Sequence, residues 1–307
     1  MLLTGVRRLL IVLFALLNIV FLCMYVYEQK SSDYVSEDFV LSAIENLSDR
    51  GISVSADVLE RAVPNFPAGK IVLNDGEDEG KKVSDSVVRF TLGNGQVKAV
   101  GFETPHGASF SYYSADESIS NIQLAKTEYN NDDFSFSYSD FRYEKEAEAP
   151  KEIIDTFSKE ISYSDKKLLE DFVMCFGKSK GLGYRISGCK EYEDGTVFSL
   201  VQVYGDTDIK DMYMNVLVWN EEILSAKGNW ISEKVSKNYK YEMTDGVNAA
   251  FALDLDDVSE ILSERCVYSL KRTDENSYYL LPVWEIKYLS VQGDERFFVF
   301  ESDIENR

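Results

Sequence analysis

The longest apolar stretch of the sequence, Leu9–Tyr27, places the strongest constraint on the chain. It reads LLIVLFALLNIVFLCMYVY and contains no charged residue and one side-chain amide, Asn18. A helix needs about 20 residues to cross the hydrocarbon core of a bilayer, which is roughly 30 Å thick. The stretch has that length, so we expect a single transmembrane helix at residues 9–27.

Basic residues set the expected orientation of this helix. Arg7 and Arg8 directly precede the apolar stretch, and positive charge beside a span tends to stay in the cytoplasm. We therefore expect a cell-membrane protein with a single span, a cytoplasmic leader at residues 1–8 and an extracytoplasmic region from residue 28. The alternative is a cleaved signal peptide, which is usually shorter and ends at small residues. This stretch ends in large side chains, which favours a retained anchor.

The charge of the chain limits its ligands. The sequence has 53 acidic and 32 basic residues, which gives a net charge of −21 at pH 7. An acidic surface repels nucleic acid, anionic lipid and anionic cell-wall polymers. We expect none of these three as a ligand, and solubility is the simplest role for the charge.

Three cysteines follow the apolar stretch: Cys175, Cys189 and Cys266. Three thiols cannot all pair within one chain, and no C-x-x-C spacing indicates zinc. The sequence therefore predicts a fold held by hydrophobic burial. A bridge between Cys175 and Cys189 stays open at this point.

The first part of the outer region shows a helical pattern and then an alternating one. Ser36 has the features of a helix N-cap and Gly51 those of a helix end. Residues 62–84 are rich in proline, glycine and acidic residues and are interpreted as a loop. From Val83 the apolar period becomes two, with Val88, Phe90 and Leu92 alternating. Asn94-Gly95 then predicts a hairpin that returns through Val97–Phe102.

Further short strands complete this first unit. The charged segment Glu144–Pro150 is the expected boundary, which gives a first α+β unit at residues 28–145 and a second at residues 146–307. Two further strands are expected near Phe110–Tyr112 and Ile122–Leu124, and aromatic residues mark one or two more strands within Phe134–Tyr143.

The second unit repeats the plan of a helix followed by strands. Apolar spacing predicts a helix from Ile153 to Phe176 and another that opens at Thr244 or Asp245 and continues or restarts through Leu262. The fold class expected for the whole region is α+β, with two units that each combine a helix and an antiparallel meander. The strands expected in this unit are Tyr184–Tyr192, Val197–Tyr204, Met212–Trp219, Ile223–Ile231, Cys266–Arg272, Tyr278–Leu289 and Phe297–Phe300.

No pattern in the sequence indicates catalysis. His106 is the one histidine, and no motif places it beside a nucleophile and an orienting acid. The acidic pairs Asp132-Asp133 and Asp256-Asp257 are adjacent in sequence, whereas a glycosidase holds two carboxylates across a cleft. No glycine-rich phosphate loop opens a helix after a strand. We expect no catalytic residue, no metal, no cofactor and no small-molecule substrate, and therefore no enzyme.

Several short segments, in this order, are similar to one family. They are Leu17-Asn18-Ile19, Arg50-Gly51-Ile52, Tyr204-Gly205 and Leu281–Ile286 (LPVWEI). Through them the chain resembles the YycH/YycI family, most closely the YycI type. The resemblance implies a non-enzymatic, bitopic regulator of a cell-wall-related sensor histidine kinase of a two-component system in Gram-positive bacteria. It also implies action through membrane helices packed beside those of the kinase.

Two hypotheses about function follow. In the first, the chain contacts a sensor histidine kinase, and a related regulator in the membrane, through the span and the extracytoplasmic region. The candidate contact residues on the span are Ala15 and Asn18, because small residues and amides favour helix–helix contact in membranes. In the second, the chain is a membrane-tethered extracellular module that binds a peptide or a glycan. A membrane-anchored hydrolase has only the acidic pairs in its favour.

Overall fold

The structure, a computed structural model, describes most of the chain beyond the apolar stretch. Among the described residues, no helix combines the length and the apolar character that a membrane span requires. This finding contradicts the expected single-pass membrane localisation. Leu9–Tyr27, with Ala15 and Asn18, lies outside the described residues. The structure describes residues 35–301 except 60–66, 74–78, 94–96, 105–106, 117–120, 131, 144–151, 155–156, 158, 178–180, 194, 242 and 275–276.

Strands dominate the described part of the chain, so the expected α+β class is wrong and the fold is mostly β. Two segments expected to be helical contribute to this difference. The described residues of 153–161 form no helix, and residues 258–262 begin a long strand. The helices are α2 (Glu37–Asp49), α3 (Glu79–Leu92), α4 (Tyr163–Val173) and α5 (Gly246–Ala250). The strands are β1 (Pro67–Val72), β2 (Val97–Thr104), β3 (Gly107–Ser114), β4 (Gln123–Asn130), β5 (Ser135–Asp140), β6 (Leu182–Tyr192), β7 (Gly195–Tyr204), β8 (Thr207–Trp219), β9 (Glu222–Asn229), β10 (Val235–Lys240), β11 (Val258–Asp274), β12 (Ser277–Ser290) and β13 (Glu295–Phe300).

The chain divides into two compact units that do not follow sequence order. Unit 1 comprises Met1–Pro67, Lys240–Cys266 and Pro282–Arg307, and unit 2 comprises Ala68–Tyr239 and Val267–Leu281. The boundary expected between residues 145 and 146 lies outside the described residues. Strands from either side of it, β5 and β9, are neighbours in one sheet.

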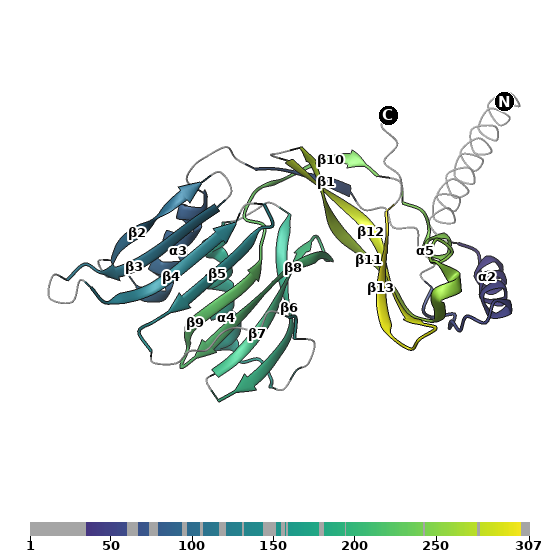
Figure 1. Cartoon of the computed structure of the whole chain (residues 1–307), viewed down its shortest axis with the longest axis horizontal. Coiled ribbons are helices and arrows are strands. Elements are labelled where there is room, and N and C mark those ends of the chain that lie inside the picture. The colour runs from purple at the N-terminus through teal and green to yellow at the C-terminus, as the bar shows by residue number, and fades with distance from the viewer. Residues whose placement is uncertain are drawn as a thin grey trace, which may run out of the picture. The chain divides into compact units, whose positions relative to one another are not determined.

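Unit 2 is built on an eight-stranded antiparallel sheet. The strand order is β6-β7-β8-β9-β5-β4-β3-β2, as Figure 1 shows. In the same unit, β1 pairs antiparallel with the first residues of β12, and β11 meets β8 in a parallel pairing at Tyr268 and Ile209. The strands β6–β9 agree with the four consecutive strands expected from the sequence.

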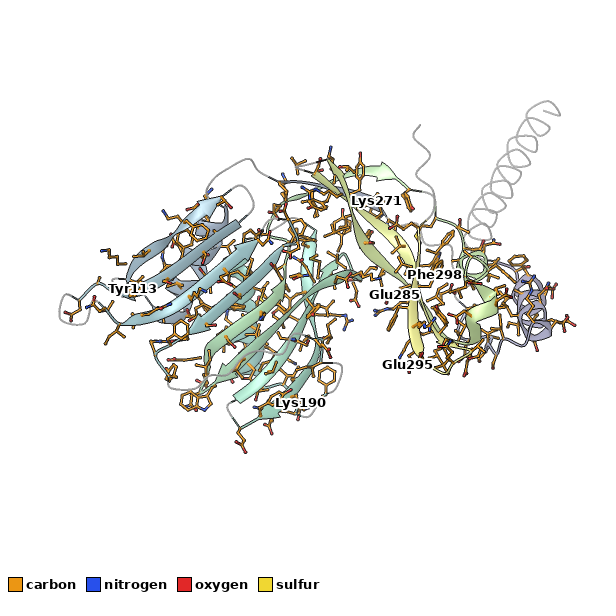
Figure 2. The ribbon with its side chains drawn as sticks, in the orientation of Figure 1. Tyr113, Lys190, Lys271, Glu285, Glu295 and Phe298 are labelled. Atoms are coloured by element: carbon orange, nitrogen blue, oxygen red, sulfur yellow. The ribbon has the colours of Figure 1, made fainter. Side chains whose placement is uncertain are left out.

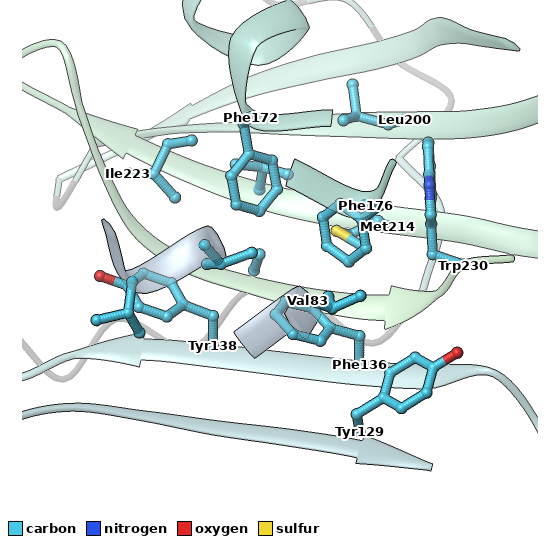
Figure 3. Close-up of a cluster of buried hydrophobic side chains, with 14 of the residues drawn as sticks. Val83, Tyr129, Phe136, Tyr138, Phe172, Phe176, Leu200, Met214, Ile223 and Trp230 are labelled. Carbon is cyan, nitrogen blue, oxygen red and sulfur yellow. The ribbon is translucent and has the colours of Figure 1, made fainter. Parts of the chain in front are cut away.

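One face of this sheet packs against α3 and α4 around an aromatic core. The short 3-10 helix Met174–Phe176 follows α4 and places Phe176 between Phe136 and Trp230, as Figure 3 shows. Alternate residues of the strands face this core, which accounts for the apolar pattern of period two. The core includes Val83, Val87, Phe110, Tyr112, Tyr129, Tyr138, Phe172, Phe198, Leu200, Met214 and Ile223.

Helix α3 corrects the first-unit prediction. Val83, Val87 and Val88 are buried at helical spacing, so residues expected to be a loop and then a strand form one helix. Gly93, at φ +75°, follows its last residue. Asn94-Gly95 lies outside the described residues, but the element that ends before it is a helix and not a strand, so the expected hairpin is wrong. The loop expected at residues 62–84 also contains β1. The alternating run of Val88, Phe90 and Leu92 is too short to distinguish a period of two residues from a period of 3.6 residues.

The connection between β8 and β9 is a two-residue turn with unusual residues. Trp219 pairs with Glu222, and the two residues between them, Asn220 and Glu221, have φ of +48° and +62°. Positive φ at both positions is the type I′ pattern, whose right-handed twist suits a hairpin. Asparagine tolerates this region, whereas a glutamate in it is strained.

We expect Glu221→Gly to raise the free energy of unfolding by about 0.5–1 kcal/mol, because glycine removes the strain and loses part of the gain as chain entropy. Urea denaturation followed by tryptophan fluorescence measures the change. Asp206→Gly is the matched control: Asp206 follows Gly205 in the β7–β8 turn and is not at positive φ. An equal gain in both variants would contradict the explanation by strain.

Two helices of the second half are shorter than expected. Helix α4 begins after Ser162, whose hydroxyl accepts a hydrogen bond from the Asp165 amide at 3.0 Å, and the described residues between 152 and 161 are not helical. Asp245 caps α5, as expected. The extension of this helix through Leu262 is wrong, because β11 begins at Val258.

Unit 1 contains α2, α5 and the strand pair β12–β13. Ser36 caps α2 as expected, since its hydroxyl accepts a hydrogen bond from the Phe39 amide at 3.2 Å. Trp284 of β12 is fully buried, and its indole donates to the Thr244 carbonyl at 2.8 Å. Figure 2 labels Glu285, Glu295 and Phe298 on these two strands. Glu285 forms a 2.6 Å ion pair with Arg265.

The three described cysteines are free thiols. The Cys175 Sγ lies 3.6 Å from the Asp171 carbonyl, and the Cys189 Sγ lies 3.1 Å from the Lys159 carbonyl. The bridge between Cys175 and Cys189 that the sequence left open is therefore absent. Burial raises the pKa of the Cys175 thiol to about 11, so this thiol is neutral at pH 7 and is a poor nucleophile.

Candidate functional site

The sheet of unit 2 has a second face, opposite the helices, which we call the open face. Its side chains follow from the strand register, because paired residues lie on the same side of a sheet. One row across the sheet runs through Phe102, Ser109, Glu128, Ser137 and Lys227 in β2, β3, β4, β5 and β9. Strands far apart in sequence thus contribute polar side chains to one surface.

A segment of the chain covers part of the open face. Ile154 packs on the apolar side chains of Val197, Leu217 and Leu224, and its amide donates to the Ser199 hydroxyl at 3.1 Å. These contacts lie over β7, β8 and the start of β9. The part of the open face formed by β2, β3, β4, β5 and most of β9 remains accessible.

The accessible part is rich in hydroxyl groups and in lysine. Three lysines lie on it: Lys98, Lys126 and Lys227. The row through Ser137 contains one carboxylate, Glu128. This local excess of lysine contrasts with the net charge of −21 for the chain. Tyr113 of β3, labelled in Figure 2, lies on the same face, opposite Lys98. The half-buried serines of this face are Ser109, Ser111, Ser135, Ser137 and Ser139.

A pocket of about 410 Å³ lies on the open face where β8 leaves β9. The last residue pair between these strands is Met214 and Gly228. A Cβ atom at Gly228 would lie 2.0 Å from the carbonyl oxygen of Tyr213, so glycine permits the close approach of β8 at this point. The pocket is lined by Glu128, Tyr129, Asn130, Ser135, Phe136, Ser137, Tyr213, Lys227, Gly228 and Asn229.

The side chains on the pocket's own side of the sheet are polar. Phe136 and Tyr129 are buried in the core beneath, so the strands' backbones, not these rings, form the floor. Glu128 is held by a 2.5 Å ion pair with Lys126. Burial, with smaller contributions from Asp211 and Glu152, raises the pKa of Tyr213, so its hydroxyl is protonated at neutral pH.

The groups that line the pocket are suited to binding a polar ligand. The pocket offers amide, ammonium and hydroxyl donors and carboxylate, amide and hydroxyl acceptors. None of its lining residues is a histidine or a cysteine. Within the described ranges, no group of three or more His, Cys, Asp or Glu side chains could hold a metal ion.

The residues that the sequence singled out lie elsewhere. Asp133 caps the start of β5, since its carboxylate accepts a hydrogen bond from the Ser135 amide at 3.0 Å. Asp257 forms a 2.5 Å ion pair with Arg296 in unit 1. Each acidic pair therefore has one member, Asp133 or Asp257, in a structural contact. His106 and the two candidate contact residues on the apolar stretch lie outside the described residues.

Sequence reasoning missed the pocket. A signal for it was present in β5, which reads Ser135-Phe136-Ser137-Tyr138-Ser139. Strict alternation of serine and aromatic residues indicates one apolar face and one hydroxyl face. The other walls come from β4, β8 and β9, whose adjacency depends on sheet topology and cannot be obtained from local pattern.

Comparisons with known proteins address the fold alone. No protein-family model and no curated protein sequence matches the chain. A crystal structure of an uncharacterized protein from Eubacterium rectale ATCC 33656 is similar, with a TM-score of 0.53 and 9% identity over 80% of this chain and 86% of that one. The C-terminal domain of YpeB from Bacillus megaterium is a weak neighbour, with a TM-score of 0.31 and 14% identity over 74% of this chain and 98% of that domain.

Proposed function

We propose that the chain is a non-enzymatic binding module that takes a neutral glycan in the pocket on the open face. The observation that carries this proposal is the composition of the pocket: a volume of about 410 Å³ with carboxylate, amide, ammonium and hydroxyl groups supplied by four strands. Ligand sites commonly have volumes of about 300–1,000 Å³, and a few placed polar groups determine their specificity.

The chemistry of the lining favours a glycan over a peptide. Vicinal hydroxyls of a sugar need donors and acceptors side by side, and Asn130, Ser137 and Asn229 supply both kinds. Tyr213 adds an aromatic ring at the wall, and such rings pack against the apolar faces of ligands. The pocket has no cluster of aliphatic side chains that would receive an apolar residue of a peptide. The two charged side chains that line the pocket, Lys227 and Glu128, are of opposite sign, which suits a neutral ligand, and the net charge of −21 repels an anionic polymer.

Replacing Ser137 by leucine should abolish this binding. The new side chain would project into the pocket, remove one hydroxyl and exclude the ligand, and we expect at least a tenfold loss of affinity. The full chain is first screened against an array of neutral oligosaccharides, and the best ligand is then titrated by calorimetry against the wild type and the variant.

Ser139→Leu is the matched control. Ser139 lies on the same face of β5 but does not line the pocket, so its replacement should leave affinity within about twofold of the wild type. Equal binding by wild type and Ser137→Leu would refute the pocket as the site. Binding of peptides and of no oligosaccharide would refute the glycan as its ligand.

The sequence resemblance supports a second, separate proposal. In it, the chain regulates a cell-wall-related sensor histidine kinase, together with a related regulator, by direct contact. Its support is the order of the similar segments; of these, Arg50-Gly51 follows the end of α2 and Leu281–Ile286 lies in β12. The test is autophosphorylation of the purified kinase with and without the full chain. An unchanged rate, together with no co-purification, would rule this proposal out.

A further inference from the structure

Strand β2 is a free edge of the sheet in unit 2. Among the described residues, β2 pairs only with β3, and most of its residues are exposed. Val100 is 52% exposed and Phe102 is 64% exposed. The opposite edge strand, β6, is partly paired, because Cys189 forms an isolated parallel β-bridge with Phe157 through the backbone.

The hydrogen-bonding pattern of β2 leaves some of its backbone N–H and C=O groups without a strand partner, among the described strands, at this edge. Thr104 and Gly107 pair across a connection of two residues, which makes them a hydrogen-bonded pair of the hairpin. Bonded and non-bonded pairs alternate along an antiparallel ladder. The residues whose N–H and C=O groups therefore point away from β3 are Val97, Ala99, Gly101 and Glu103.

An exposed edge of this kind accepts an extended strand. It has no proline and no bulge within β2 itself, two of the devices by which proteins usually block such pairing. Its two charged residues, Lys98 and Glu103, are of opposite sign, so two copies of this edge bring no net charge together. The partner that the strand fits must therefore be extended, antiparallel or parallel, and apolar at the positions opposite Val100 and Phe102.

We infer that this partner is β2 of a second copy of the chain, paired antiparallel about a two-fold axis at Gly101. A two-fold axis perpendicular to the sheet makes each face of one copy continue into the same face of the second copy. Residues with even numbers therefore pair with residues with even numbers. The axis at Gly101 places Val100 opposite Phe102 of the second copy and Lys98 opposite Thr104. The interface is isologous, as in most dimers.

Neighbouring registers fit less well. An axis at Val100 would pair Val100 with its own copy but would place Lys98 opposite the exposed ring of Phe102, which leaves one apolar cross-strand pair. An axis at Phe102 would shorten the paired segment, because β2 ends at Thr104. The register centred on Gly101 combines a seven-residue overlap with two apolar cross-strand pairs, and such pairs stabilise sheets.

Mixed disulfide formation tests the register directly. Val100 and Phe102 of the second copy form a non-hydrogen-bonded pair, in which the Cβ atoms are close enough for a disulfide. Full-length chains carrying Val100→Cys are mixed with chains carrying Phe102→Cys and oxidised with copper–phenanthroline. We expect a covalent dimer in the mixture, at least tenfold more abundant than in either variant alone. The wild-type chain, which keeps its native cysteines, is the blank.

Other outcomes overturn the inference. A mixture that gives no more dimer than the blank excludes the β2 contact, and efficient cross-linking of Val100→Cys alone excludes this register.

A proline supplies an independent measurement. The Ala99 amide points to the open edge, so Ala99→Pro removes a hydrogen bond of the dimer and none of the β2–β3 ladder. We expect the dimer of Ala99→Pro to have a dissociation constant at least tenfold higher than that of Ala99→Thr, which keeps its amide, as measured by sedimentation velocity. The circular dichroism spectrum of Ala99→Pro should be unchanged. Equal association of the two variants, both folded, would overturn the proposal.

Discussion

Replacing Phe176 by alanine is expected to lower the free energy of unfolding by about 3–5 kcal/mol, the usual range for a buried phenylalanine. Phe176 is 2% exposed, and its ring centroid lies 4.9 Å from that of Phe136, 5.6 Å from that of Phe172 and 6.0 Å from that of Trp230. Removing it leaves a cavity among three rings that cannot collapse without moving the strands. Urea denaturation monitored by tryptophan fluorescence measures the loss.

Phe141→Ala is the control for this variant. Phe141 follows β5 and is 49% exposed, so its truncation should cost less than about 1 kcal/mol. Should both variants lose the same stability, the aromatic cluster would not be the centre of the core of unit 2.

Replacing Arg142 by methionine is expected to cost about 3 kcal/mol. The Asp140 side chain is fully buried, and Arg142 binds it through Nε and Nη2, at 3.1 Å and 2.7 Å. Arg142 also contacts the Thr91 carbonyl and Glu222, each at 3.2 Å. Removing one partner of a buried ion pair leaves an uncompensated charge, which costs about 3–5 kcal/mol. We expect the lower end because Arg142 is 29% exposed.

A second variant separates the ion pair from simple packing. Replacing Asp140 by leucine in the Arg142→Met background removes the buried charge, so we expect stability to recover by at least about 1 kcal/mol. Lys167→Met is the control: it breaks an exposed pair with Asp171 and should cost about 0.5 kcal/mol or less. A double variant less stable than Arg142→Met would show that the carboxylate is not the cause.

Local patterns were sufficient for much of the sheet. The strands β6–β9 coincide with long alternating runs separated by turn residues. Such runs predict both the presence of a strand and its position in the sequence. The caps Ser36 and Asp245 begin α2 and α5 as expected, because an N-cap depends only on residues within one turn. Such elements could be predicted from the sequence.

The missed elements depend on tertiary contacts. Helix α3 carries a stripe of Val83, Val87 and Val88, but proline, glycine and acidic residues before it obscured the period. Strand β11 begins where an apolar helical spacing continues in the sequence. Val258 and Ile261 lie three residues apart, as on one face of a helix, but both are buried residues of β11, which local spacing could not show. The pocket could not be predicted at all, since it needs the adjacency of β5 and β9, whose paired residues lie 86 (Ser139 and Ser225) to 94 (Ser135 and Asn229) residues apart in sequence.

The alternation of serine and aromatic residues in β5 also protects the chain against mispairing. A shift of β5 by one residue would turn Phe136 and Tyr138 to the open face and force three serines into the core. Exposing two aromatic side chains costs about 3–6 kcal/mol, and each buried hydroxyl without a partner adds about 1–3 kcal/mol. The slipped state would therefore be populated in fewer than about one molecule in ten thousand. The serines that line the pocket thus also make the correct alignment of the central strand the only stable one.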